Sequence, residues 1–328
     1  MAEPIIINRD NKAPIILRGV TDWGEVTRIA KSAADNAVVL LIYNDLVTID
    51  KTILGAINEL AVGKLNDVGA YVYDETLKSF STNDKTTASG VASHAIGNST
   101  VASGTNSHAE GYSTTAKGTN SHAEGNTTTA SGGNSHAEGY KTTASANQSH
   151  AEGNGTQATN AGAHAEGDAS VAMGKASHAE GVNTEASNEA SHAEGSWTVA
   201  YAASSHAEGY CTSTNGKYAH AEGCESVANG AQSHAEGYNN VASGVSSHVE
   251  GSGNESVNTA QHVCGKYATI DTTTKVIFQI GIGTSESDRK DAIVVTTDGQ
   301  FTFGNDKGET VTFSVKELTK LKTFLGTL

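Results

Sequence analysis

The chain has few of the residues that fill a large globular core. Its 328 residues include only 2 prolines, 2 tryptophans and 5% aromatic residues, and hydrophobic residues reach 37%. Such a composition argues against one large globular domain, because a core of that size needs more apolar side chain. We therefore expect repetition of a small unit to supply the stability.

Cysteines are also scarce and odd in number. Cys211, Cys224 and Cys264 form no CxxC pair, which argues against a disulfide framework. Cys211 and Cys224 fall on neighbouring repeats and could lie close together. We expect free thiols, with a pairing of these two as the alternative.

Positive charge and long apolar runs are lacking as well. Lys and Arg number 21 against 36 Asp and Glu, giving a net charge of -15, so we expect no nucleic-acid partner. No stretch of about 18 apolar residues is present, which predicts no membrane insertion. The segment 1–4 has neither a basic region nor a cleavage site, so we expect no secretion signal and synthesis in a host cytoplasm.

What the chain does have is a fourteen-residue unit with the core SHAEG, repeated over 86–265. Self-similarity at a short fixed period indicates a solenoid built from stacked copies of one unit. All 13 histidines follow the period, at 94, 108, 122, 136, 150, 164, 178, 192, 206, 220, 234, 248 and 262. Twelve of the glycines three residues after them are assigned to turns: Gly97, Gly111, Gly125, Gly139, Gly153, Gly167, Gly181, Gly195, Gly209, Gly223, Gly237 and Gly251.

Each unit reads as two short strands. Ser107 and Ala109 alternate with His108 and Glu110, which is the period of a strand with the small residues inside. The second half repeats a Thr and Ala parity, as in Thr114 and Ala116, and Gly, Asn and Ser separate the halves. A helix is excluded because Gly, Ser, Thr and Asn are poor helix formers. We expect only Ala, Ser, Thr and Gly to point inward.

The outward positions differ between the two halves. Five residues after each histidine the sequence varies freely, from Lys141 to Trp197, so this site, assigned to the second strand, should face solvent. The first strand keeps His and Glu, except that Ile96 and Cys264 replace Glu at the two ends. A face with constant residues predicts a constant neighbour, which symmetry supplies as a second copy of the chain; exposed cross-strand pairs are the alternative. The predicted interface ladder is His108, Glu110, His122, Glu124, His136, Glu138, His150, Glu152, His164, Glu166, His178, Glu180, His192, Glu194, His206, Glu208, His220, Glu222, His234, Glu236, His248 and Glu250.

The unit resembles the YadA-type head repeat of trimeric autotransporter adhesins. The family pattern N-S-V-A-I-G is matched by N-S-H-A-E-G at 106–111, 120–125 and 134–139, and S-H-A-I-G at 93–97 lies between the two spellings. The resemblance covers about 180 residues and implies a left-handed parallel β-roll that is three chains wide. His and Glu replace the Val and Ile of the family's interface, which implies a polar seam between the chains.

The flanking segments divide the rest of the chain. Residues 1–48 should form a small N-terminal anchoring module with strands and one helix over 23–34, and 49–85 a helical neck or linker with a helix over 50–65. The phrase GAINEL at 55–60 resembles a segment that recurs in tail and fibre proteins of bacteriophages.

Residues 266–328 should form a C-terminal cap. We expect strands at 275–282, 292–297 and 309–315, with Asp298-Gly299 turning the second strand into another at 300–303. A terminal helix should follow Ser314 as its cap, with an apolar seam at Leu318, Leu321, Leu325 and Leu328.

The histidines do not indicate catalysis. Imidazole and carboxylate groups can ligate zinc or nickel, but a catalytic site is one irregular constellation, whereas this pattern is repeated thirteen times. We therefore predict no enzyme, no cofactor and no dedicated metal site, with incidental ion binding on the ladder as the alternative. The threonines at 100, 114, 128, 142 and 156 share the inward parity of Ala, which argues against an ice-binding face.

The residues predict an all-β parallel β-roll solenoid that forms a homo-oligomer, and the resemblance implies that the roll is left-handed and the oligomer a homotrimer. The predicted function is a structural virion protein, a bacteriophage head or tail fibre or spike. We expect residues near the N-terminus to bind other virion proteins and the exposed surface to contact a host glycan or protein. The alternatives are a bacterial trimeric surface adhesin and a carbohydrate-degrading tail spike. For the last, the two tryptophans offer few aromatic platforms for a sugar.

Overall fold

The chain divides into two compact units, Met1–Ala61 and Val62–Leu328. In the first unit, the computed structural model describes β1 (Ile5–Arg9) and β2 (Lys12–Leu17), which pair in antiparallel fashion with Ile5 opposite Leu17. These are two of the strands expected within residues 1–48. The helices expected over 23–34 and 50–65 lie outside the described residues, which in the second unit are 72–74, 76–77, 79–82, 85–273 and 275–325.

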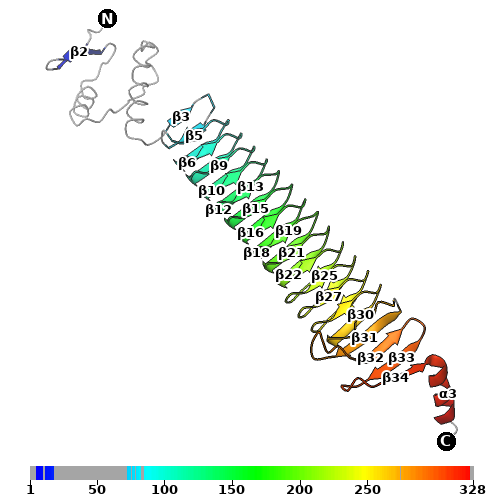
Figure 1. Cartoon of the computed structure of the whole chain (residues 1–328). Coiled ribbons are helices and arrows are strands. Elements are labelled where there is room, and N and C mark those ends of the chain that lie inside the picture. Colours follow the sequence, from blue (N-terminus) through cyan, green and yellow to red (C-terminus); the bar gives the residue numbers. More distant parts are fainter. Residues whose placement is uncertain are drawn as a thin grey trace. The chain divides into compact units, whose positions relative to one another are not determined.

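The second unit is a parallel β-solenoid of about 14 turns with a fourteen-residue repeat. Figure 1 shows its turns stacked one upon the next, from cyan through green to yellow. Each turn has one strand that starts at the histidine, here called the long strand; it has five residues in most turns and two in β24, β26 and β28. These strands are β6 (His94–Asn98), β8 (His108–Tyr112), β10 (His122–Asn126), β12 (His136–Tyr140), β14 (His150–Asn154), β16 (His164–Asp168), β18 (His178–Val182), β20 (His192–Ser196), β22 (His206–Tyr210), β24 (His220–Ala221), β26 (His234–Ala235), β28 (His248–Val249) and β30 (His262–Lys266).

A second, two-residue strand follows in each turn and forms a separate parallel sheet. It begins seven residues after the histidine in most turns. Its members are β5 (Thr87–Ala88), β7 (Val101–Ala102), β9 (Thr115–Ala116), β11 (Thr129–Ala130), β13 (Thr143–Ala144), β15 (Gln157–Ala158), β17 (Val171–Ala172), β19 (Glu185–Ala186), β21 (Val199–Ala200), β23 (Ser213–Thr214), β25 (Val227–Ala228), β27 (Val241–Ala242) and β29 (Glu255–Ser256). The prediction of two strands per repeat is confirmed.

The fourteen-residue step places identical residues side by side in the sheet. His122 pairs with His108 on one side and with His136 on the other, and Glu124 pairs with Glu110 and Glu138 in the same way. A sequence period therefore becomes a column of one residue type running along the solenoid.

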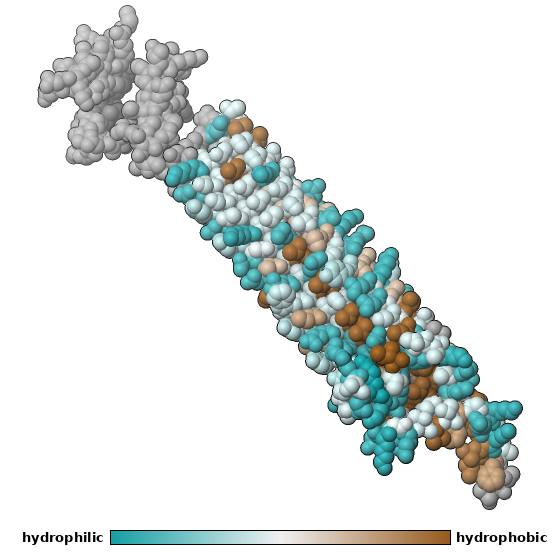
Figure 2. All heavy atoms as spheres, in the orientation of Figure 1, coloured by the Kyte–Doolittle hydropathy of each residue, from teal (hydrophilic) through white to brown (hydrophobic). Residues whose placement is uncertain are grey.

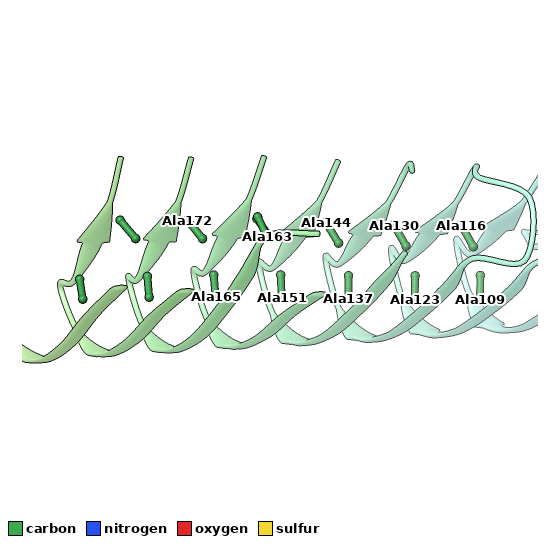
Figure 3. Close-up of a cluster of buried hydrophobic side chains, with 14 of the residues drawn as sticks. Ala109, Ala116, Ala123, Ala130, Ala137, Ala144, Ala151, Ala163, Ala165 and Ala172 are labelled. Carbon is green, nitrogen blue, oxygen red and sulfur yellow. The ribbon is translucent and has the colours of Figure 1, made fainter. Parts of the chain in front are cut away.

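Two rows of alanines fill the interior, one from each sheet, as Figure 3 shows. Ala109 and Ala116 are fully buried, as are Ser107 and Thr114 beside them. The burial of these side chains confirms the predicted inward parity. The expectation for the threonines is also confirmed, since Thr100, Thr114, Thr128, Thr142 and Thr156 are all 0% exposed.

The prediction that only small residues point inward is wrong for the last turns. Val249 and Val263 replace alanine in the interior, and Asn240 and Asn254 replace threonine. The asparagines fit because their amides satisfy backbone groups. Asn254 donates from Nδ2 to the carbonyls of Glu250 (2.8 Å) and Gly265 (2.9 Å), and its own backbone N–H donates to Asn240 Oδ1 at 2.8 Å.

The assignment of the variable site to the second strand is also wrong. Residues five positions after the histidine form a corner of the coil in the left-handed region, such as Ser113 (φ 54°), Lys141 (φ 56°) and Trp197 (φ 60°). The chain must reverse direction twice in fourteen residues, which leaves this site in the turn. The corner N–H groups join the turns, as Ser113 N donates to the Asn98 carbonyl at 2.8 Å.

The long-strand sheet starts before the repeat does. Strands β3 (Val72–Asp74) and β4 (Ser79–Ser81) form an antiparallel hairpin, and β4 pairs in parallel with β6. This hairpin falls within the segment 49–85 expected to be a helical neck or linker, so the sheet extends further toward the N-terminus than predicted.

The C-terminal cap continues the same sheet. Strand β31 (Val276–Ile282) pairs in parallel with β30, and β32 (Asp291–Thr296), β33 (Gln300–Gly304) and β34 (Thr310–Ser314) follow in antiparallel order. Helix α3 (Val315–Leu325) follows, and Glu317 N donates to Ser314 Oγ at 3.2 Å as a capping box requires. The predicted strands, the Asp298-Gly299 turn and the helix cap are confirmed.

Candidate functional site: the histidine–glutamate face

The histidine–glutamate face is the outer surface of the long strands, from His94 to Cys264. Its most regular feature is a column of 13 imidazole rings with centroids 4.5 to 4.9 Å apart. From His122 onward neighbouring rings are nearly parallel, with interplanar angles of 3° to 16°. The parallel backbone register imposes this spacing, because each ring sits one strand above the last.

Phenylalanine rings cover both ends of the column. Phe80 lies 4.7 Å from His94, and Phe278 lies 5.5 Å from His262 with the rings at 83°. Sequence reasoning missed both residues. Phe80 lies one fourteen-residue step before His94, so the period contained a signal for it, whereas Phe278 follows His262 by sixteen residues and falls out of step.

Each histidine of the ladder lies beside a glutamate, but the pairing changes along the column. From His108 to His206 the imidazole Nε2 lies 3.4 to 3.9 Å from Glu Oε2 of the same turn. From His220 to His262 it lies 3.2 to 3.6 Å from Glu Oε1 of the preceding turn. Glu208 contacts both His206 and His220, and the change coincides with the shortening of the strands at β24.

The histidines and glutamates project away from the alanine interior, as predicted. Their side chains keep 33% to 41% and 31% to 50% of their surface exposed, respectively. In ten of the histidines, nevertheless, Nε2 itself is inaccessible to solvent and has no hydrogen-bond partner within the described part of the chain. From Glu110 to Glu194 the glutamate side chain is more exposed than the histidine beside it, whereas from Glu208 to Glu236 it is not.

Burial and the neighbouring imidazoles favour the neutral form of several histidines in the column. Burial, followed by the neighbouring imidazoles, lowers the pKa of His122, His150, His164, His178 and His192 below the usual 6.5. Imidazolium ions stacked at this spacing would repel one another. At neutral pH these rings therefore bring no positive charge to the carboxylates beside them.

The carboxylates also interact with one another where the pairing changes. A side-chain hydrogen bond with Glu222, followed by burial, raises the pKa of Glu208. The pKa of Glu222 is lowered by its hydrogen bonds to Glu236 and Glu208. Both shifts arise from contacts between carboxylates stacked on adjacent turns.

The glycines assigned to turns lie in the long strands in most turns. Gly111 is the fourth residue of β8 and has φ of 116°, and a Cβ there would lie 2.0 Å from the carbonyl oxygen of Gly125 in the next turn. The expectation of a turn is wrong for the nine glycines from Gly97 to Gly209, because the corners lie two residues before and five residues after each histidine. Gly223, Gly237 and Gly251 lie just beyond the shortened strands β24, β26 and β28. Glycine is required here by the close stacking of backbones.

The predicted seam of the terminal helix is exposed. None of the eleven residues of α3 is buried; Leu318 is half-buried, and Leu321 and Leu325 are 47% and 59% exposed. Leu328 lies outside the described residues. The apolar face of this helix thus has no covering element in the described part of the chain.

Exposed aromatic side chains form a second surface feature that sequence reasoning missed. Figure 2 draws hydrophobic residues in brown, mainly over the middle and the C-terminal half of the roll, and its hydropathy scale leaves tyrosine and tryptophan pale. The exposed aromatic side chains are therefore distinct from the brown patches. Their signal in the sequence was the position four residues after histidine, which tyrosine fills in four turns. The exposed tyrosines and tryptophan are Tyr112, Tyr140, Trp197, Tyr201, Tyr210, Tyr218 and Tyr238.

Several turns also bring three metal-ligating groups together. In six such sets the ligand atoms lie within 4.8 Å of one another; they include four of only His and Glu, such as His164, Glu166 and His178, and one of Glu250, His262 and Cys264. The three cysteines are free, as predicted, and burial, followed by the charge of Glu250, raises the pKa of the Cys264 thiol.

Comparisons with known proteins do not assign the chain to a family. A scan against protein-family models finds no match, and a search of curated proteins also finds none. Among the described helices, none has the length and apolar character needed to span a membrane.

Proposed function

We propose that this chain is a structural virion protein, a trimeric head or tail fibre or spike of a bacteriophage. In this proposal three parallel chains form a left-handed β-roll and meet along the histidine–glutamate face. Residues near the N-terminus attach the fibre to the capsid or tail, and its exposed surface contacts a glycan or protein of the host.

The observation that carries this proposal is that the histidine–glutamate face keeps the same residues in every turn of the ladder, whereas the residues at the corners vary. Glu110 to Glu250 form an uninterrupted column in which like charges lie on adjacent strands, an arrangement that costs stability in an isolated sheet. The corner residues, which face solvent, range from Lys141 to Trp197. A face that keeps an unfavourable pattern through eleven turns is best accounted for by a contact that uses it, and a symmetric copy of the same column provides one.

Two further features support the proposal. The apolar face of α3 at Leu318, Leu321 and Leu325 is suited to pack against two symmetric copies of itself. The resemblance to YadA-type head repeats and the GAINEL phrase at 55–60 favour a trimeric fibre and a phage origin.

The oligomeric state tests the trimer directly. Native mass spectrometry and sedimentation of the full chain at pH 7.5 should give a species of three chains. A monomer of 33.6 kDa at micromolar concentration would contradict the proposal.

The virion role requires a separate experiment. Antibodies against the chain should label intact phage particles at a fixed position in electron micrographs. Labelling of bacterial cell surfaces, with unlabelled particles, would favour the surface adhesin instead.

A further inference from the structure

We propose that Glu250, His262 and Cys264 form a binding site for a divalent transition-metal ion of the zinc class. All three ligands come from one chain, so the site does not depend on the proposed trimer. It lies at the C-terminal end of the histidine–glutamate face, where the ladder meets the cap.

The backbone places the three side chains together. His262 and Cys264 are two residues apart in β30 and project from the same outer face. Glu250 belongs to the preceding turn, where its N–H donates to the Val263 carbonyl at 2.9 Å. Cys264 occupies the position that glutamate holds in the other turns of the ladder, so this turn alone adds a sulfur ligand.

The distances are close to those that a metal ion requires. Glu250 Oε1 lies 3.5 Å from His262 Nε2, and all three ligand atoms lie within 4.8 Å of one another. Zinc bonds of about 2.0 to 2.3 Å at tetrahedral angles place two ligand atoms about 3.4 to 3.6 Å apart. Rotation of the half-exposed Glu250 and Cys264 side chains is sufficient to close the remaining gap.

The ligand at His262 is also free to bind. Its Nε2 is inaccessible to solvent and lacks a hydrogen-bond partner in the described part of the chain. Thiolate, imidazole and carboxylate together suit zinc or cobalt and not calcium or magnesium, which prefer oxygen ligands. Three protein ligands leave a fourth position for water or for another ligand.

The other turns lack this arrangement. Between His122 and His262 neighbouring imidazoles are nearly parallel, so their in-plane lone pairs point in the same direction and do not converge on one ion. Beyond His262 the next residues in register are Phe278 and Ile280, which supply an apolar wall and no competing ligand. The Cys264 thiol donates a weak hydrogen bond to the Gln279 carbonyl at 3.5 Å, and the sulfur gives up this bond when it binds the ion.

Binding involves no change of oxidation state. The Cys264 thiol releases its proton to solvent as the sulfur–metal bond forms. Water molecules of the hydrated ion are displaced by His262 and Glu250.

Cobalt(II) titration of the full chain tests the site, because a cobalt–thiolate bond gives a charge-transfer band in the near ultraviolet. Cobalt bound only to the other histidines gives no such band. We expect the band to saturate at one equivalent per chain and to disappear when zinc is added. A chain without the band would overturn the proposal.

Matched variants assign the band to its ligands. Cys264→Ser should abolish it, whereas the double variant Cys211→Ser/Cys224→Ser should retain it; a band that survives in Cys264→Ser would refute the site. Glu250→Gln should weaken cobalt binding at least about tenfold, while Glu236→Gln, one turn away, should not. Equal effects of the two glutamate variants would also refute the site. Neither glutamate variant changes the Cys264 thiol or the fold, so the comparison isolates the carboxylate ligand.

Discussion

The ring of Phe80 lies 4.7 Å from the ring of His94, one period further along the chain. At the other end of the column Phe278 covers His262. The first and last imidazoles are thus shielded by apolar rings, as expected of capping turns in a solenoid. Such ends keep the stacked histidines from meeting a free strand edge.

The glycine of the SHAEG core should tolerate no side chain. In Gly139→Ala the new Cβ would lie 2.1 Å from the Gly153 carbonyl oxygen, and φ is 110°. We expect a loss of at least about 1–3 kcal/mol from backbone strain, seen as a lower midpoint of thermal unfolding by circular dichroism.

Gly155→Ala is the matched control for this change. Gly155 has φ of 69° and no atom within 4 Å of the point that a Cβ would occupy, and Ala169 adopts φ of 54° at the same corner of the next turn. Its midpoint should stay close to that of the wild type. Equal losses in the two variants would show that the contact between strands is not the cause.

Acid should destabilise the roll. His122, His150, His164, His178 and His192 have lowered pKa values in the folded chain, chiefly through burial, so the unfolded chain binds more protons below about pH 6.5. Their contribution is fully present above pH 6.5 and is lost as the pH falls toward their folded pKa values. Thermal unfolding at pH 7.5, 6.5 and 5.5 should show a falling midpoint, and a constant or rising midpoint would contradict this account.

The two faces of a turn should respond differently to a lysine. Glu180→Lys places a cation on the proposed seam and should weaken assembly of the trimer, measured by sedimentation. Asn183→Lys should leave assembly unchanged, because Lys141 already occupies the equivalent corner with φ of 56°. Equal tolerance of both changes would place the glutamate column in solvent.

Removing either of two buried hydroxyl groups should change the free energy of unfolding, with opposite or unequal effects. Thr128 Oγ1 is buried without a hydrogen-bond partner in the described part of the chain, so Thr128→Val should be neutral or stabilise by about 1 kcal/mol. Ser135 Oγ donates to the Gly132 carbonyl at 2.7 Å, and Ser135→Ala should cost about 1 kcal/mol. Urea unfolding measures both changes; stabilisation by Ser135→Ala, or a loss above about 1 kcal/mol in Thr128→Val, would show that hydrogen bonding does not decide stability here.

The strands could be predicted from the sequence because small and large residues alternate along them. In a strand with one buried face, such alternation places the small residues inside and the large ones outside. Ala109 had to point inward once His108 and Glu110 pointed outward. The corners were harder to place, because residues as different as Lys141 and Trp197 adopt the same left-handed conformation there. The corner positions share a backbone conformation but no residue type, so the sequence alone does not mark them as corners.

Phe278, at the C-terminal end of the histidine column, was missed for a different reason. The step from His262 to Phe278 is sixteen residues, so a search at fourteen residues stops one turn too early. The change of glutamate partner at Glu208 depends on side-chain rotation, which no sequence period records.

The constant fourteen-residue register also determines in what steps the length of the solenoid can change. Removing or duplicating fourteen residues leaves every remaining backbone group with an equivalent neighbour, and the length changes by about 4.8 Å. An odd number of residues would instead turn imidazoles into the alanine interior. A gene of this kind can therefore lengthen or shorten its product one coil at a time while both ends stay as they are.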